Sequence, residues 1–168
     1  IEIWLTIEGQ TAVCGLRLSD RTMRHRTYKQ EHQAASLRPT VAAAIQTIAA
    51  ARAGETVLDP MCGVGTILAE QWEMGKGKVR ILGGDIEKNA AANAVANLAG
   101  IGCESEVKVW DARRLPLEDA SVDHVISNPP FGKQLSSPEE LGPLYRALVK
   151  ECDRVLKPGG QAVLLASD

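Results

Sequence analysis

Short apolar runs alternate with segments of helical periodicity over residues 56–168. The runs are short and rich in aliphatic residues, as buried strands are, and they occupy residues 56–58, 80–82, 107–110, 124–127 and 161–166. Helices are predicted over residues 66–74, 88–99 and 139–156, with a turn at Lys157-Pro158-Gly159-Gly160 before the last strand. Strands that alternate with helices predict an α/β fold with a doubly wound, mostly parallel, Rossmann-like sheet of five strands, covered on both faces.

The first 52 residues have a different pattern. Residues 2–7 and 11–18 are rich in apolar residues and flank Glu8-Gly9-Gln10, which predicts a β-hairpin. Residues 34–52 are dense in Ala, Ile and Val and predict a helix with Pro39 near its first turn. We therefore expect a hairpin with a basic linker over residues 1–33 and one domain over residues 34–168.

The composition is that of one soluble globular domain, with 168 residues, 45% hydrophobic and 24% charged. Cysteines 14, 62, 103 and 152 form no Cys-x-x-Cys, and the histidines stand at no zinc spacing from them, so we expect no metal. Isolated cysteines fit a reducing compartment, which favours the cytoplasm, or the nucleus in a eukaryote. No apolar run approaches the ~20 residues of a membrane span, and because the chain starts at Ile rather than Met we expect a fragment.

Charge is uneven along the chain. Residues 17–38 contain six Lys or Arg against two acidic residues, a local charge of +4 in a chain of formal charge −2. Such a segment either contacts the phosphates of a nucleic acid or is a solvated linker, and the charge alone leaves both interpretations open.

A glycine-containing loop, Asp59-Pro60-Met61-Cys62-Gly63-Val64-Gly65-Thr66, joins the first sheet strand to its helix. Gly63 and Gly65 let the backbone turn sharply and approach a ligand, and the helix starting near Thr66 directs free amide donors to the same place. Ligands of such sheets bind at the carboxyl ends of the strands. A Gly-x-Gly pair alone is a weak signal.

Three carboxylates strengthen this signal, because Asp59, Asp85 and Asp111 end three successive predicted strands and converge on one sheet edge. Asp85 follows Gly65 by 20 residues, where a carboxylate accepts hydrogen bonds from ribose hydroxyls. Asp111 is placed to reach an adenine amino group. Ile86 packs either on the adenine or in the core, and the pattern leaves both open.

The carboxylates also discriminate between nucleoside cofactors. A dinucleotide fits poorly, because its fingerprint needs Gly or Ala where this chain has Leu68, and because Asp59 repels a pyrophosphate. ATP is disfavoured by the same charge and by the lack of Gly-Lys-Ser/Thr. S-adenosylmethionine has no phosphate, and its sulfonium and α-amino cations attract carboxylates. We expect it as the cofactor.

The fourth sheet strand ends in Ser127-Asn128-Pro129-Pro130-Phe131. Asn128 offers an amide oxygen as an acceptor. Pro130 contributes no N–H and fixes its own φ, so the Pro129 carbonyl is held in a set direction. Phe131 offers a face for stacking on a base. We predict that Asn128, Pro129 and Phe131 form a catalytic site for a flat amine. The tetrapeptide alone also permits a proline-rich loop without a ligand.

The glycine block, Asp85, Asp111 and residues 128–133 together resemble class I S-adenosylmethionine-dependent methyltransferases that act on amino nitrogens. With Leu37-Arg38-Pro39-Thr40 upstream, essentially the whole chain is similar to THUMP-domain RNA guanine-N2 methyltransferases. The resemblance implies cofactor contacts from Asp59, Cys62, Gly63, Gly65, Thr66, Asp85, Ile86, Asp111, Ala112 and Asn128. It implies RNA contacts from Arg38 and Lys133, with Arg24 and Arg26 as further candidates.

The resemblance also sets expectations about substrate and partners. It implies methylation of guanine N2, most readily in tRNA and otherwise in small nuclear RNA, and leaves open whether a small activator subunit is needed. A THUMP domain would lie before Ile1, and such sheets usually continue after the fifth strand, so we expect a truncated sheet. The alternatives are adenine-N6 or protein-glutamine methylation, and a non-catalytic RNA-binding scaffold. A nicotinamide oxidoreductase fails at Leu68 and leaves residues 128–131 unexplained.

Overall fold

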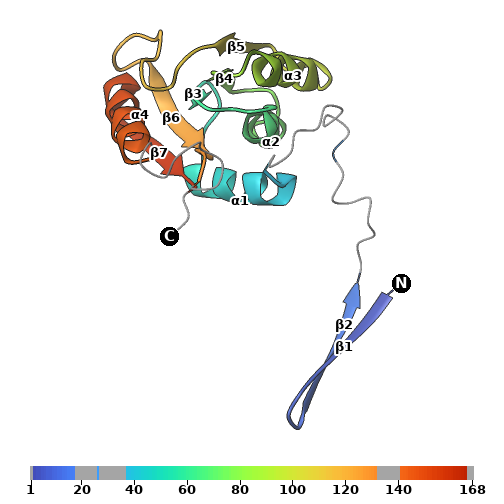
Figure 1. Ribbon diagram of the computed structural model, residues 1–168. Helices are drawn as coiled ribbons and strands as arrows, with labels where there is room; N and C mark the ends of the chain where they lie inside the picture. The colour runs from blue at the N-terminus through green and yellow to red at the C-terminus, as the bar shows by residue number, and fades with distance from the viewer. Residues whose placement is uncertain (1, 18–25, 27–36, 132–140, 166–168) are drawn as a thin grey trace.

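The computed structural model describes residues 2–17, 26, 37–131 and 141–165 (Figure 1). The strands are β1 (Glu2–Glu8), β2 (Thr11–Arg17), β3 (Thr56–Asp59), β4 (Arg80–Asp85), β5 (Ser105–Val109), β6 (Val122–Ser127) and β7 (Leu156–Leu164). The helices are α1 (Pro39–Ala49), α2 (Thr66–Met74), α3 (Lys88–Ala99) and α4 (Leu141–Val155). The predicted hairpin is confirmed, with β1 and β2 antiparallel.

The five remaining strands form one sheet in the order β5-β4-β3-β6-β7, and every neighbouring pair is parallel. The predicted α/β class and five-stranded parallel sheet are therefore confirmed. The chain runs outward from β3 to β4 and β5, then returns to the other side of β3 to form β6 and β7. Strand order thus reverses between β3 and β6, and the carboxyl ends of strands at such a switch point are where ligands of open α/β sheets bind.

Side chains alternate across the sheet and build two apolar layers. Val57, Ile81 and Ile126 face α1, α2 and α3 in one buried cluster, while Leu58 and Val125 face α4 in the other. Figure 1 shows the helices on the two sides of the sheet. The alternation of 2.0 residues per repeat explains why adjacent residues of one strand serve opposite layers.

Helix α1 starts later than its composition predicts. The prediction began at residue 34, whereas the helix begins at Pro39, and residues 34–36 lie outside the described residues. Arg38 has an extended ψ of 133°, because the ring of a following proline disfavours the α conformation. The helix ends at Ala49, since Ala50 adopts a left-handed φ of 49°.

Strand β7 includes the residues predicted as a turn. Val122 pairs with Leu156 and His124 with Gln161, so Lys157-Pro158-Gly159-Gly160 forms an irregularity inside the strand. Gly159 has a φ of +83°, and a Cβ at Gly160 would lie 2.9 Å from the Asp123 carbonyl oxygen. The glycines permit a bulged close approach of the two backbones, and the separate-turn prediction is wrong.

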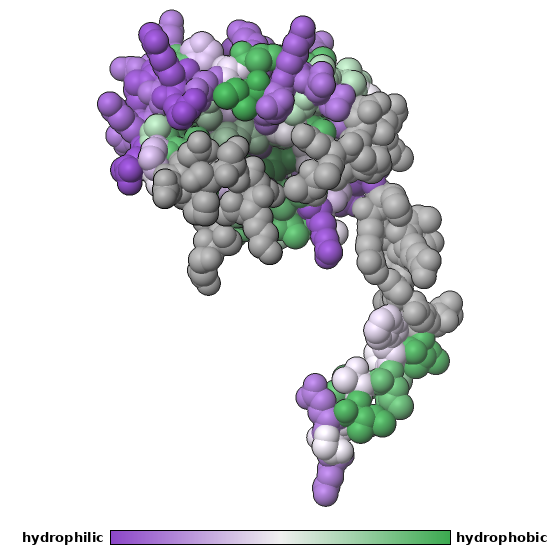
Figure 2. Space-filling view, in the orientation of Figure 1, coloured by the Kyte–Doolittle hydropathy of each residue, from purple (hydrophilic) through white to green (hydrophobic). Residues whose placement is uncertain are grey.

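The hairpin carries an unusual surface. On one face the register pairs Ile3 with Leu16 and Leu5 with Cys14, and Ile3, Leu5 and Leu16 are each more than 60% exposed. Figure 2 shows this apolar surface on the hairpin. The predicted boundary between linker and domain, near residue 33, lies outside the described residues and stays a prediction.

None of the helices in the described ranges has the length and apolar character to cross a membrane. Among those same residues, no group of three or more His, Cys, Asp or Glu side chains is arranged to hold a metal ion.

Candidate active site

The glycine loop after β3 is held between two helices and β4. Gly65 begins α2 with a φ of 81°, and a Cβ there would lie 3.1 Å from the Cβ of Ala94 in α3. Both the backbone conformation and the packing thus disfavour a side chain at Gly65. At Gly63, with a φ of +53°, a Cβ would meet nothing within 4 Å. The backbone at Gly63 therefore borders open space at the carboxyl edge of the sheet.

Asp85, the last residue of β4, fastens this loop. Its Oδ2 accepts the Gly63 N–H at 2.9 Å and its Oδ1 accepts the Glu87 N–H at 2.9 Å. Each carboxylate oxygen keeps further acceptor capacity. Asp85 thus combines a structural role in the loop with the capacity to accept the hydroxyl donors of a ribose.

Asp59, the last residue of β3, is only 1% exposed. Its Oδ1 accepts hydrogen bonds from Ser127 Oγ at 2.6 Å and from the Met61 N–H at 3.1 Å. Burial, opposed by these two bonds and assisted by the charge of Asp85, raises the pKa of Asp59 to about 7. A carboxyl that changes charge near neutral pH thus lies where the amino-acid part of the cofactor is predicted.

Asp111 lies two residues beyond the end of β5, which is Ser105–Val109 rather than the predicted 107–110. Its carboxylate, 38% exposed, pairs with Arg113 at 2.6 Å. The Arg113 hydrogen bonds hold the pKa of Asp111 below its usual value. Ala112 beside it is buried. An adenine amino group at this position would share the carboxylate with Arg113, which sequence reasoning did not anticipate.

Ile86 is 58% exposed, so its alternative role in the core is wrong. It follows Asp85 directly at the carboxyl end of β4, where an exposed apolar side chain can pack against a planar ring. Packing on the adenine remains the prediction for this residue.

Trp110 is a contributor that sequence reasoning missed. Its indole Nε1–H donates to the Pro60 carbonyl at 3.0 Å, and its ring occupies the space where a Cβ of Gly84 would lie. The Trp110 ring thus ties the loop after β5 to the glycine loop after β3. The available signal was the Gly83-Gly84 pair in the neighbouring strand, which leaves room for a large ring.

The predicted amine site follows β6 directly. Ser127 is fully buried, Pro129 is buried, and Asn128 and Phe131 are half-buried. The Asn128 Oδ1 is buried, and within residues 2–17, 26, 37–131 and 141–165 it has no hydrogen-bond partner. Because buried polar atoms are nearly always paired, this acceptor requires an explanation.

The basic residues predicted to contact RNA fall into three groups. Arg38 is exposed at the start of α1. Arg26 Nε pairs with Glu70 Oε1 at 2.7 Å, and the Glu70 side chain is only 5% exposed. Arg26 is therefore held at α2 by this ion pair rather than being a freely projecting cation. Arg24 and Lys133 lie outside the described residues.

The residues fit S-adenosylmethionine in three respects. Gly63 borders open space, and Asp85 keeps acceptor capacity for a ribose. The buried Asp59 carboxyl is hydrogen-bonded to Ser127, which directly precedes Asn128, whose buried Oδ1 has no partner among the described residues. The structure thus brings Asp59, Asp85 and Asn128 to one edge of the sheet. The contact that each makes with the cofactor remains a prediction.

Three comparisons with known proteins agree. The family model described as RMKL-like, methyltransferase domain, matches residues 26–168. The U6 snRNA (guanine-N(2))-methyltransferase THUMPD2 of Mus musculus is 37% identical over 173 residues, covering 100% of this chain and 31% of the relative. The tRNA (guanine(6)-N(2))-methyltransferase THUMP3 of Bos taurus is 31% identical over 181 residues, covering 100% of this chain and 36% of the relative.

A solved structure shows that the fold is similar as well as the sequence. The crystal structure of TrmN from Thermus thermophilus matches with a TM-score of 0.78 and 28% identity, covering 98% of this chain and 48% of that one. The chain spans less than half the length of each of these three proteins. The family match over most of the chain, the parallel sheet and the site at its switch point establish that the chain belongs to the RMKL-like methyltransferase domain family, whose cofactor is S-adenosylmethionine.

Proposed function

We propose that the protein containing this chain methylates the exocyclic amine of a base in RNA, with guanine N2 as the target atom. The observation that carries the proposal is the buried Oδ1 of Asn128, which has no partner in the described part of the chain. A buried acceptor left unpaired costs about 1–3 kcal/mol, so its retention favours a site where a ligand supplies the donor. The N–H of an amino group is such a donor.

Two acceptors suit an amino group better than one. The lone pair of an exocyclic amine is delocalised into the ring, which makes the nitrogen a poor nucleophile. If Asn128 Oδ1 and the Pro129 carbonyl each accept one N–H, the lone pair is directed away from both. Phe131 then fixes the plane of the base by stacking.

The cofactor supplies an electrophilic methyl group when bound. The protein's own contribution is positioning and electrostatic stabilisation. No dedicated general base is required, because the proton can leave the nitrogen after methyl transfer. Asp59 is proposed to face the amino-acid part of the cofactor, and Asp85 is proposed to bind the ribose.

The choice of guanine N2 draws on the relatives. The mouse and cattle relatives are both named as guanine-N2 methyltransferases, one of U6 snRNA and the other of tRNA. Their names agree on the atom and differ in the RNA. We propose tRNA as the first substrate and U6 snRNA as the second, with Arg38 and Lys133 contacting phosphates.

The whole protein is proposed to carry a THUMP domain that binds RNA and to act in the cytoplasm, or in the nucleus of a eukaryote. The four cysteines are unpaired, which supports a reducing compartment. A small activator subunit is a further proposed partner, suggested by the family resemblance.

The test uses full-length protein purified from its native host, so that any activator subunit co-purifies. Methyl-labelled S-adenosylmethionine is offered with tRNA, U6 snRNA, DNA and protein in separate reactions. We expect label in tRNA or U6 snRNA, recovered after digestion as N2-methylguanosine. Label in adenine or glutamine would contradict the target atom. RNA binding without transfer to any substrate would favour a non-catalytic scaffold.

A further inference from the structure

The loop 128–131 owes much of its shape to its own covalent structure. Pro129 and Pro130 each have φ fixed by the ring. Asn128 and Pro129 each precede a proline, which restricts their ψ to extended values. Pro130 is different, because Phe131 follows it and imposes no such restriction. After the φ of Asn128, the ψ of Pro130 is therefore the next torsion in the loop that no proline restricts.

This torsion sets the direction of the Pro130 carbonyl and, through the same peptide plane, the position of Phe131. The Tyr145 hydroxyl of α4 donates a hydrogen bond to that carbonyl at 3.3 Å. Burial raises the pKa of Tyr145 above its ordinary value, so the phenol stays protonated and able to donate at neutral pH. Tyr145 thus acts on a torsion that the two prolines do not fix.

Helix α4 is a firm support for this contact. Leu148, Cys152 and Val155 are at most 3% exposed and pack against the sheet. Glu151 Oε2 accepts the Leu115 N–H at 2.7 Å, which fastens α4 to the loop after β5 as well. Because α4 is packed against the sheet independently of the loop 128–131, a hydrogen-bond donor on α4 can restrain that loop.

We propose that Tyr145 is a positioning residue of the amine site: its hydroxyl holds the Pro130 carbonyl and so fixes the ring of Phe131 against the target base. The proposal rests on the proposed function, because it assigns Phe131 to a base. Tyr145 acts through Phe131 and does not itself touch the base or the cofactor.

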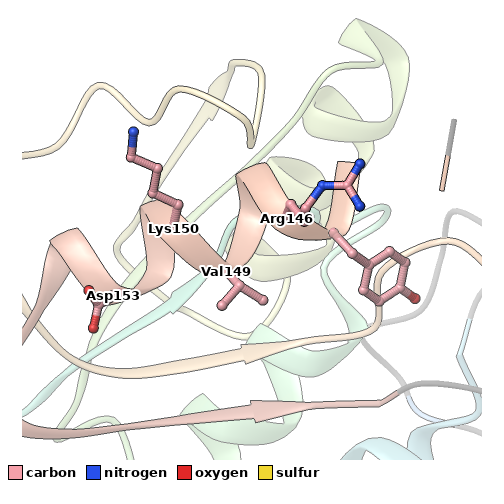
Figure 3. Close-up of a pocket in the computed structure, with 5 residues that line it drawn as sticks. Arg146, Val149, Lys150 and Asp153 are labelled. Atoms are coloured by element: carbon pink, nitrogen blue, oxygen red, sulfur yellow. The ribbon is translucent and has the colours of Figure 1, made fainter. Parts of the chain in front are cut away.

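The neighbours of Tyr145 supply a control. Arg146, Val149, Lys150 and Asp153 line a surface hollow on α4 together with Tyr145, and Figure 3 shows these four along the helix. Lys150 is exposed. Its replacement by Gln changes the lining of the same hollow and leaves the hydroxyl of Tyr145 in place.

The test compares Tyr145→Phe with Lys150→Gln in the full-length protein. We expect Tyr145→Phe to slow single-turnover methylation about 2- to 10-fold, the net effect of an ordinary hydrogen bond, while S-adenosylhomocysteine affinity stays within twofold. In a Phe131→Leu background Tyr145→Phe should slow methylation no further, since the two residues act in series. Lys150→Gln should match the wild type.

A second readout does not depend on activity. The protein is labelled with fluorophenylalanine, and the Phe131 resonance is assigned by its loss in Phe131→Leu. The resonance that Tyr145→Phe adds at position 145 is assigned in the double variant with Phe131→Leu. We expect Tyr145→Phe to shift or broaden that resonance and Lys150→Gln to leave it unchanged. An unshifted resonance, or additive effects with Phe131→Leu, would overturn the proposal. A wild type that methylates no RNA would refute the proposed function, while the fluorine signal would still decide whether Tyr145 positions Phe131.

Discussion

Ser127 Oγ donates a 2.6 Å hydrogen bond to Asp59 Oδ1, and both residues are essentially excluded from solvent. The bond joins the last residue of β6 to the last residue of β3, across the point where strand order reverses. Asn128 follows Ser127 directly, so the bond links the predicted amine site to the predicted cofactor site. One buried contact thus connects the two predicted sites.

Removing this bond destabilises the protein in a pH-dependent way. In Ser127→Ala, the buried Asp59 carboxyl loses a donor, which costs about 1–3 kcal/mol. Because the Ser127 bond lowers the pKa of Asp59, its loss raises that pKa further. The folded-state pKa of about 7 exceeds the ordinary value of 3.8 for this carboxyl, so the contribution of Asp59 to stability is present at low pH and lost as pH rises through 7.

We therefore expect Ser127→Ala to lower the thermal unfolding midpoint more at pH 8 than at pH 5. Ser121→Ala is the matched control, because the Ser121 Oγ donates to the Glu118 carbonyl at 2.7 Å at an exposed site. The control should change the free energy of unfolding by less than about 0.5 kcal/mol. Equal effects at the two pH values would contradict the assigned ionisation of Asp59.

Cofactor affinity should rise with pH. The α-amino cation of the cofactor attracts the ionised form of Asp59, and a pKa of about 7 makes that form scarce at pH 6 and predominant at pH 8. S-adenosylhomocysteine carries the same cation, so its binding should tighten by up to roughly tenfold between these pH values, with proton release on binding at pH 6.

Titration calorimetry in buffers of different ionisation enthalpy measures both quantities. Asp59→Asn should bind more weakly and show neither the pH dependence nor the proton release. A wild-type affinity that is constant from pH 6 to 8 would show that Asp59 does not face the cation.

The ion pair between Arg26 and Glu70 should contribute strongly to stability. Glu70 has a side chain only 5% exposed, so Arg26→Met removes the guanidinium from a buried carboxylate and should cost more than the loss of an exposed pair. Arg80→Met is the control, since its partner Glu106 is 50% exposed and exposed pairs contribute at most about 1 kcal/mol. Urea unfolding of both variants measures the difference, and similar losses would contradict the larger contribution expected of the Arg26 ion pair.

The sheet and the converging carboxylates are predictable because both depend on local pattern. Short runs such as 124–127, with β-branched residues at their centre and turn residues after them, favour buried strands. Once successive strands are parallel, Asp59 and Asp85 must end at the same edge. Short motifs then predicted the glycine loop and the amine site, and the resemblance to a known family added guanine N2 and the RNA contacts.

Contacts between strands that are distant in the chain could not be predicted in this way. Ser127 meets Asp59 only because β6 inserts beside β3, and a periodic pattern does not specify which strand becomes a neighbour. Trp110 packing over Gly84 depends on the same spatial order. Ile86 remained ambiguous for a related reason, since one apolar residue at a strand end fits either a core or a ligand surface.

The most direct test of the account is the effect of Asn128→Ala on two quantities measured together. Loss of the Asn128 acceptor removes one of two groups that orient the amine, so methyl transfer to RNA should fall about 10²- to 10³-fold, as when one preorganised polar group is removed from an active site. S-adenosylhomocysteine affinity should stay within a few fold of wild type. Asn89→Ala, at an exposed position of α3, should change neither. Normal turnover in Asn128→Ala would contradict the central claim that its side-chain oxygen receives the amino group.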